Sequence, residues 1–190
     1  MKSYSLIIAL LLLLPLSGNA KTPRMMELQS AGMMGAAHLS YGATFWQKHT
    51  FSLGVGAVPE LDYHDDMLIF SLKYRYTPAW EKPFTWFDHK MTWRPVSFST
   101  AIIQGQDNDI YRKLPDDIPD GYYPPSATRI LFSMQTNVDV TDRLEAYWDW
   151  TVLDVGLINY ARNFNFYRDN YKYAGLGGIV SFGVGVRVKL

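Results

Sequence analysis

Three side chains in this sequence are of the types that build a nucleophilic catalytic site. His38 and Ser40 are next-but-one neighbours, so on a β-strand the imidazole and the hydroxyl lie on one face, close enough for a base and a nucleophile. Glu145 carries a carboxylate that could orient the imidazole as a third member. The chemistry would be acyl hydrolysis or transfer. The alternative, which we favour, is that these are ordinary polar residues lining the inside of a sheet.

A second candidate site is the acidic stretch between residues 104 and 127, which carries Asp107, Asp109, Asp116 and Asp117. Carboxylate oxygens are the ligands that Ca²⁺ and Mg²⁺ prefer in proteins. The spacing matches no EF-hand loop, and the same stretch contains several prolines, so a solvated loop explains it equally well. The sequence leaves both interpretations open.

Two global properties exclude other classes of function. The chain has no cysteine, which excludes disulfides, thiolate catalysis and zinc–sulfur sites. The formal net charge is zero, so there is no basic excess to draw the protein onto nucleic acid, and we expect no nucleic-acid partner. No pattern in the sequence indicates a cofactor.

Charged side chains also recur on one face of several alternating segments. They are Lys73, Arg75, Glu145, Asp149 and Arg187, with Lys189 beside the last. If this face points inward, the charges are costly to bury unless they pair and hydrogen-bond with one another. We therefore predict a salt-bridge network inside the protein. A ligand-binding or proton-relay role for the same charges is the alternative.

The elements that position these residues are β-strands, because apolar and polar residues alternate with a period of two. Seven segments show the pattern, at residues 36–45, 51–57, 67–76, 95–103, 130–138, 144–152 and 180–190. A closed barrel of this kind needs an even number, so we expect an eighth strand, first at residues 25–33. The connection at 77–92 is the other place for it, or for a short helix. The last strand should pair with the first.

The N-terminal residues 1–20 have the pattern of a signal peptide. Lys2 precedes an apolar run from Leu6 to Leu14, and small residues lead up to a cleavage site before Lys21. The apolar run is shorter than the roughly 20 residues that a membrane-spanning helix needs. The predicted mature domain, residues 21–190, contains no other apolar segment that approaches the length of a membrane-spanning helix. In a membrane it would therefore have to form a closed barrel.

Connection lengths predict the orientation of such a barrel. The short turns near Lys48 and Asp142, and the connection at 77–92, would be periplasmic, whereas residues 59–66, 104–127 and 154–172 would be extracellular. Aromatic residues make up 15% of the chain, with thirteen Tyr and six Trp, as interfacial girdles require.

The signal peptide, the alternating strands and the terminal run from Ser181 to Leu190 resemble the small outer-membrane β-barrel proteins of Gram-negative bacteria, and among them uncharacterised members. The last residue of such proteins is usually Phe, where this chain has Leu190. The resemblance implies a closed antiparallel up-and-down transmembrane β-barrel of eight strands, located in the outer membrane after export. It implies outer-membrane lipid and lipopolysaccharide as surroundings, the barrel-assembly machinery as a partner, and no cofactor.

His38-Leu39-Ser40 also resembles the His-x-Ser motif of outer-membrane lipid A deacylases, in which Asn follows the Ser and the motif lies late in the chain. Here Tyr41 follows, on an early strand. Our first hypothesis is a non-enzymatic outer-membrane barrel with a packed polar lumen, whose loops stabilise the envelope or bind a surface partner. The second is a lipid hydrolase using Ser40 and His38. The third is a soluble periplasmic lipocalin-like carrier with its apolar face inward, because a period of two does not say which face is inside.

Overall fold

The computed structural model describes residues 22–60, 66–106, 127–169 and 179–190. Both the predicted signal peptide and the carboxylates predicted to bind metal, Asp107, Asp109, Asp116 and Asp117, lie outside the described residues. The strands are β1 (Arg24–Ala31), β2 (Ala37–Phe45), β3 (His49–Val58), β4 (Met67–Tyr76), β5 (Lys82–Trp86), β6 (His89–Gln106), β7 (Thr128–Asp139), β8 (Leu144–Leu153) and β9 (Val180–Lys189). The helices are α2 (Asp154–Arg162) and α3 (Phe164–Asp169).

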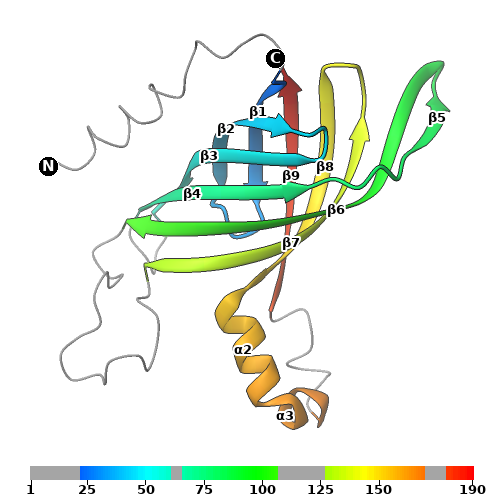
Figure 1. The fold of residues 1–190 in the computed structure, drawn as a ribbon. Coiled ribbons are helices and arrows are strands. Elements are labelled where there is room, and N and C mark those ends of the chain that lie inside the picture. The colour runs from blue at the N-terminus through cyan, green and yellow to red at the C-terminus, as the bar shows by residue number, and fades with distance from the viewer. Residues whose placement is uncertain (1–21, 61–65, 107–126, 170–178) are drawn as a thin grey trace, which may run out of the picture.

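Antiparallel pairing closes the sheet into a barrel (Figure 1). The strand order is β4-β3-β2-β1-β9-β8-β7-β6-β5, and β4 also pairs with β6. That last pairing closes a ring from which only β5 is left out, so the protein is a closed eight-stranded antiparallel barrel. The predicted fold class is therefore confirmed. The eighth strand is β1, at the position expected first, and it pairs with the last strand through contacts such as Met26 opposite Val188.

Two connections differ from the sequence prediction. The segment at 77–92 holds no helix, and its strand β5 is not part of the ring: β5 pairs with the start of β6 and forms a hairpin that extends beyond the ring. For this reason β6 begins at His89 rather than Pro95, and its register against β7 shifts between Arg94 and Ser97, as at a β-bulge. The connection after β8, expected to be a loop, begins with α2 and α3.

Burial largely alternates along the barrel strands, with mostly polar residues inside and mostly apolar residues outside; in β7 the three consecutive residues Gln135 to Asn137 are all buried. In β4, Ser71, Lys73 and Arg75 are buried, whereas Leu72 between them is 48% exposed. The lipocalin-like hypothesis needs the apolar face inside, and the structure has the reverse. A small buried apolar cluster lies where β4, β6 and β7 meet the β1–β2 turn, formed by Met34, Ile69, Ala101, Ile103 and Leu131. Within the described ranges, no helix is long and apolar enough to cross a membrane.

Candidate functional site

Arg187 lies inside the barrel and is 1% exposed. It lies on β9 directly between Glu27 of β1 and Glu145 of β8 in the sheet register. Its guanidinium forms ion pairs with both carboxylates. It also donates hydrogen bonds to Asn137 Oδ1 at 3.0 Å and to Gln135 Oε1 at 2.7 Å on β7. Because each charge has an opposite partner and neutral acceptors fill the remaining positions, the usual penalty of burying Arg is offset.

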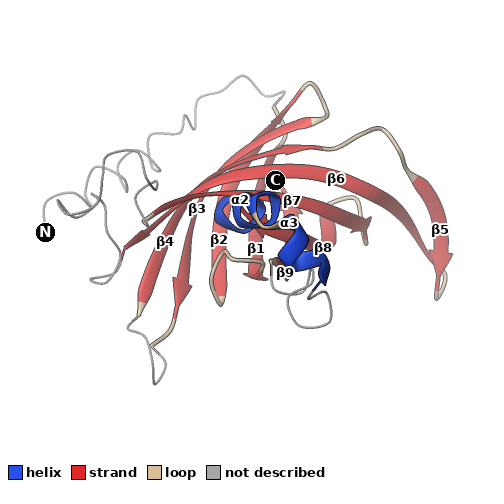
Figure 2. Cartoon of the chain, turned by 90° about the horizontal axis from the view of Figure 1, so that it is seen from below, coloured by secondary structure: helices blue, strands red, loops and turns tan. Residues whose placement is uncertain are grey.

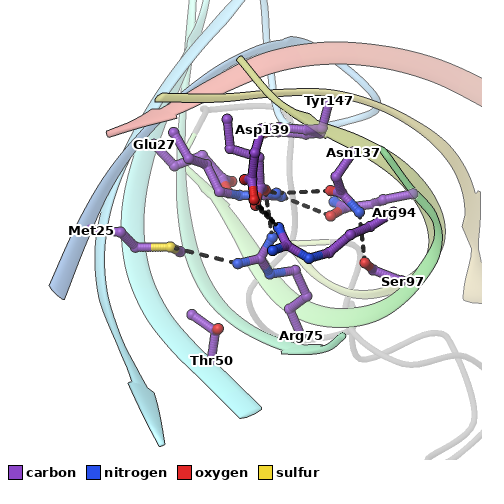
Figure 3. Close-up of polar contacts among 12 residues, drawn as sticks. Met25, Glu27, Thr50, Arg75, Arg94, Ser97, Asn137, Asp139 and Tyr147 are labelled. Atoms are coloured by element: carbon purple, nitrogen blue, oxygen red, sulfur yellow. Dashed lines mark hydrogen bonds and ion pairs between the residues drawn. The ribbon is translucent and has the colours of Figure 1, made fainter. Parts of the chain in front are cut away.

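Two cations from β4 reach the same carboxylates from another part of the wall. Lys73 Nζ is 2.6 Å from Glu27 Oε1, and Arg75 Nη1 is 2.9 Å from Glu145 Oε1. In the sheet order, β3 and β2 separate β4 from β1, so these ion pairs join strands that are not neighbours. We call this set the lumen network: Glu27, Lys73, Arg75, Gln135, Asn137, Glu145 and Arg187. Figure 3 shows Arg75 of β4 and Arg94 of the neighbouring strand β6 pointing into the same cluster. The lumen network therefore ties the wall together across the lumen.

The lumen network ends in a second group of charges near the short turns. Arg94 Nη1 is 2.6 Å from Asp139 Oδ2, and Lys189 Nζ is 3.0 Å from the other oxygen of the same carboxylate. Arg94 also lies 3.6 Å from Glu145, which connects this group to the lumen network. The side chain of Lys189 is 39% exposed, so the charges become solvated at this end of the barrel.

Tyr147 and Asp149 fill the interior on the other side of Arg187. The guanidinium carbon of Arg187 lies 3.7 Å from the centre of the Tyr147 ring, a cation–π contact, and the Tyr147 hydroxyl donates to Gln29 Oε1 at 2.9 Å. The ring lies over Gly185 on the facing strand, where a Cβ would stand only 2.4 Å from the hydroxyl oxygen. Asp149 accepts hydrogen bonds from Gln29, Gln135 and Thr151, and among the described residues it has no ion pair.

His38 and Ser40 are both buried on the inward face of β2, but they do not bond to one another. His38 Nε2 is 2.8 Å from Ser71 Oγ on β4, and Ser40 Oγ has no hydrogen-bond partner among the described protein atoms. The imidazole can reach across β3 because Gly54 and Gly56 have no side chain to block it: a Cβ at Gly54 would be 2.5 Å from the ring. The pairing partner of His38 is therefore a different serine from the one expected.

The structure brings together some of the predicted site residues and separates others. Lys73, Arg75, Glu145 and Arg187 meet in the lumen network, whereas Glu145 is bonded to arginines rather than to His38. His38 is 0% and Ser71 6% exposed, so the described part of the chain presents no surface at which a lipid could meet this pair. No cluster of metal-ligating side chains occurs in the described ranges.

Sequence reasoning missed Glu27, Gln135, Asn137 and Arg94 as members or neighbours of the lumen network. For Glu27 the signal was present, because Met26 and Leu28 flank it and the period of two places it inward once β1 is accepted as a strand. For Arg94 there was none: the register shift before Ser97 breaks the alternation that would have placed it.

No family model matches this chain, and no curated protein matches it. Among solved structures, the crystal structure of Neisserial surface protein A (NspA) is similar to it, with 14% sequence identity. The alignment covers 89% of this chain and 96% of the NspA chain, with a TM-score of 0.38. The closed barrel described above follows from the strand pairing of this chain alone.

Proposed function

We propose that this protein is a non-enzymatic outer-membrane β-barrel that closes its own lumen and serves a structural or surface-binding role. The observation that carries the proposal is the distribution of side chains, which is the reverse of that in a water-soluble protein: apolar side chains lie on the outer face and charged side chains lie inside. Each barrel strand contributes a large apolar side chain to the outer face, between 39% and 52% exposed: Leu28, Leu39, Phe51, Leu72, Ile102, Phe132, Trp150 and Val184. We call this set the outer belt. A continuous apolar surface around a charged interior is stable against lipid and costly against water.

Aromatic side chains at the short-turn end support a membrane boundary there. Phe45, Trp46, Phe51, Tyr74 and Tyr76 are linked by ring contacts, several of them through His49, at the ends of β2, β3 and β4. Tyr and Trp favour the level of the lipid headgroups, where the ring is sheltered and the polar atom stays hydrated. We assign this end to the periplasmic leaflet, with lipopolysaccharide surrounding the opposite end.

The lumen network supports a static role rather than transport. An eight-stranded barrel is about wide enough for its side chains to fill, and here charged side chains from β1, β4, β8 and β9 meet across it. The surface left for a partner is the loop end, where α2 and α3 expose Leu157, Ile158, Phe164 and Phe166. Insertion would require the barrel-assembly machinery, and the proposal needs no cofactor.

Fractionation of cells expressing the protein tests this proposal. The protein should be recovered with the outer membrane and should migrate differently on gels before and after boiling, because a closed barrel resists detergent until heated. Recovery in the soluble periplasm would refute the proposal. So would mobility that heating leaves unchanged.

A further inference from the structure

The β5–β6 hairpin extends beyond the closed ring, and the proposed function assigns it no role. β5 pairs with residues His89 to Trp93 at the start of β6, and every residue of β5 is exposed. Both views place β5 apart from the ring (Figures 1 and 2), and Figure 1 shows it at the end that carries the C-terminus. Among the described strands β5 pairs with β6 alone, so it contributes little to the stability of the barrel.

One face of this hairpin is largely apolar, with Lys82 and His89 at its two ends, and the other is polar. Cross-strand partners share a face, and the pairs are Phe84 with Met91, Trp86 with His89, and Lys82 with Trp93. The opposite face carries Pro83, Thr85, Lys90 and Thr92. Apolar and polar side chains therefore lie on different faces, as they do on a strand that contacts an apolar phase on one side.

The apolar face continues the outer face of the barrel. Trp93 lies opposite Val138, and its indole N–H donates to Thr136 Oγ1 at 2.8 Å. Thr136 in turn lies opposite Trp148, an exposed residue on the outer face of β8. The face that holds Phe84 and Trp86 is thus joined, strand by strand, to the surface that we assign to lipid.

The turn at the end of this hairpin gives independent support. Phe87 and Asp88 form a two-residue turn with positive φ at both positions, 45° and 64°, where Gly and Asn are favoured. The β2–β3 turn at the same end repeats this, with Trp46 at a φ of 48°. Trp46 is 82% and Phe87 80% exposed. A large aromatic in an unfavourable backbone conformation, with its ring in the open, points to a function outside the fold.

We propose that the apolar face of the β5–β6 hairpin lies on the lipid surface of the periplasmic leaflet, as an extension of the aromatic girdle beyond the barrel. This inference rests on the proposed membrane location. Lipid fits better than a strand-adding protein partner, because β5 is a short edge strand that contains Lys82 and Pro83, two residue types that discourage edge pairing. The face with Phe84 and Trp86 is therefore accessible to lipid, whereas the unpaired edge of β5 is unsuited to pairing with another strand.

Single cysteines can test this directly, because the chain contains none. Three full-length variants, Phe84→Cys, Thr85→Cys and Ile102→Cys, would be labelled with a polarity-sensitive fluorophore. Each would be reconstituted into vesicles of phosphatidylethanolamine and phosphatidylglycerol that carry spin-labelled lipid quenchers at a shallow or a deep position. Thr85 is the matched control on the opposite face of β5, and Ile102 belongs to the outer belt. Heat-dependent gel mobility would show that each variant has folded.

We expect Phe84→Cys to show blue-shifted emission and stronger quenching by the shallow lipid, as for a face buried about 5–10 Å into the interface. Thr85→Cys should be quenched by aqueous iodide and not by lipid. If Ile102→Cys is quenched by deep lipid while Phe84→Cys stays exposed to iodide, the hairpin inference is wrong and the membrane barrel stands. If Ile102→Cys is not quenched by lipid, the proposed function itself fails. Protection of Phe84→Cys from both quenchers would indicate a protein partner and would also overturn the inference.

Discussion

Arg187 draws its hydrogen-bond and ion-pair partners from three different strands: Glu27 on β1, Glu145 on β8, and two neutral side chains on β7. Removing this one cation leaves two carboxylates buried with fewer opposite charges. The cost arises mainly from the groups that lose their partner.

We expect Arg187→Ala to lower the free energy of unfolding by about 3–5 kcal/mol, the usual cost of breaking a buried ion pair. Lys189→Ala, two residues away on the same strand, removes a half-exposed cation paired with Asp139 and should cost about 1 kcal/mol or less. Urea titration of the protein in vesicles, followed by tryptophan fluorescence, measures both. Equal losses for the two variants would show that the lumen network does not hold the barrel together.

The two serines near His38 give a second prediction at this scale. Ser71→Ala removes the partner of the buried imidazole and should cost about 1–3 kcal/mol, because one ring nitrogen loses its hydrogen bond. Ser40→Ala removes a hydroxyl that has no partner among the described protein atoms and should change the stability by about 0.5 kcal/mol or less. The same urea titration compares them. A larger loss for Ser40→Ala would show that Ser40 is the residue that holds His38.

At the scale of the strand, each element of the barrel has a polar side and an apolar side, and the environment decides the effect of a change on each. Leu72 of β4 belongs to the outer belt, between the inward Ser71 and Lys73. Trp46 lies in the β2–β3 turn at the end of the barrel. Both side chains are exposed, so a substitution at either position tests which medium surrounds it: the lipid core at Leu72 or the membrane interface at Trp46.

We expect Leu72→Arg to cost about 2–4 kcal/mol in vesicles, and Trp46→Arg about 0–1 kcal/mol, because the penalty for a cation falls from the bilayer centre to the interface. Folding yield and urea titration in vesicles measure the difference. If Leu72→Arg were tolerated as well as Trp46→Arg, the outer belt would not face lipid.

At the scale of the whole molecule, closure by the β1–β9 and β4–β6 pairings leaves an interior that polar side chains occupy. The ion pairs from β4 to β1 and β8 cross that interior, so a solute would have to break them to pass. These crossing ion pairs favour the closed lumen that the proposed static role requires.

Vesicles that contain the protein should therefore swell in an isosmotic sugar solution no faster than protein-free vesicles. A porin reconstituted in parallel would confirm that the assay detects an open lumen. Swelling at a rate that increases with the amount of this protein would contradict the closed lumen, and with it the static role that we propose.

Much of this fold was predictable because the period of two is a local property of each strand. Residues 67–76 were expected as a strand, with Lys73 and Arg75 on one face, and the structure has β4 at the same residues with both side chains buried. The requirement for an even strand number then called for an eighth strand, and the structure has it as β1, at the first of the two places expected. The hairpin at 77–92 was missed because the even-number rule counts only the strands of the closed ring. It gives no information about a strand such as β5, which pairs outside the ring.

Which residues share a face could be predicted from the sequence, because alternation along an extended backbone needs no information from elsewhere in the chain. Which face is inside and which side chains meet depends on the folded barrel as a whole. His38 bonds to Ser71 rather than Ser40, and Glu145 to Arg75 and Arg187 rather than His38. These contacts join residues far apart in sequence, and strand register and barrel closure, which no single segment encodes, bring them together.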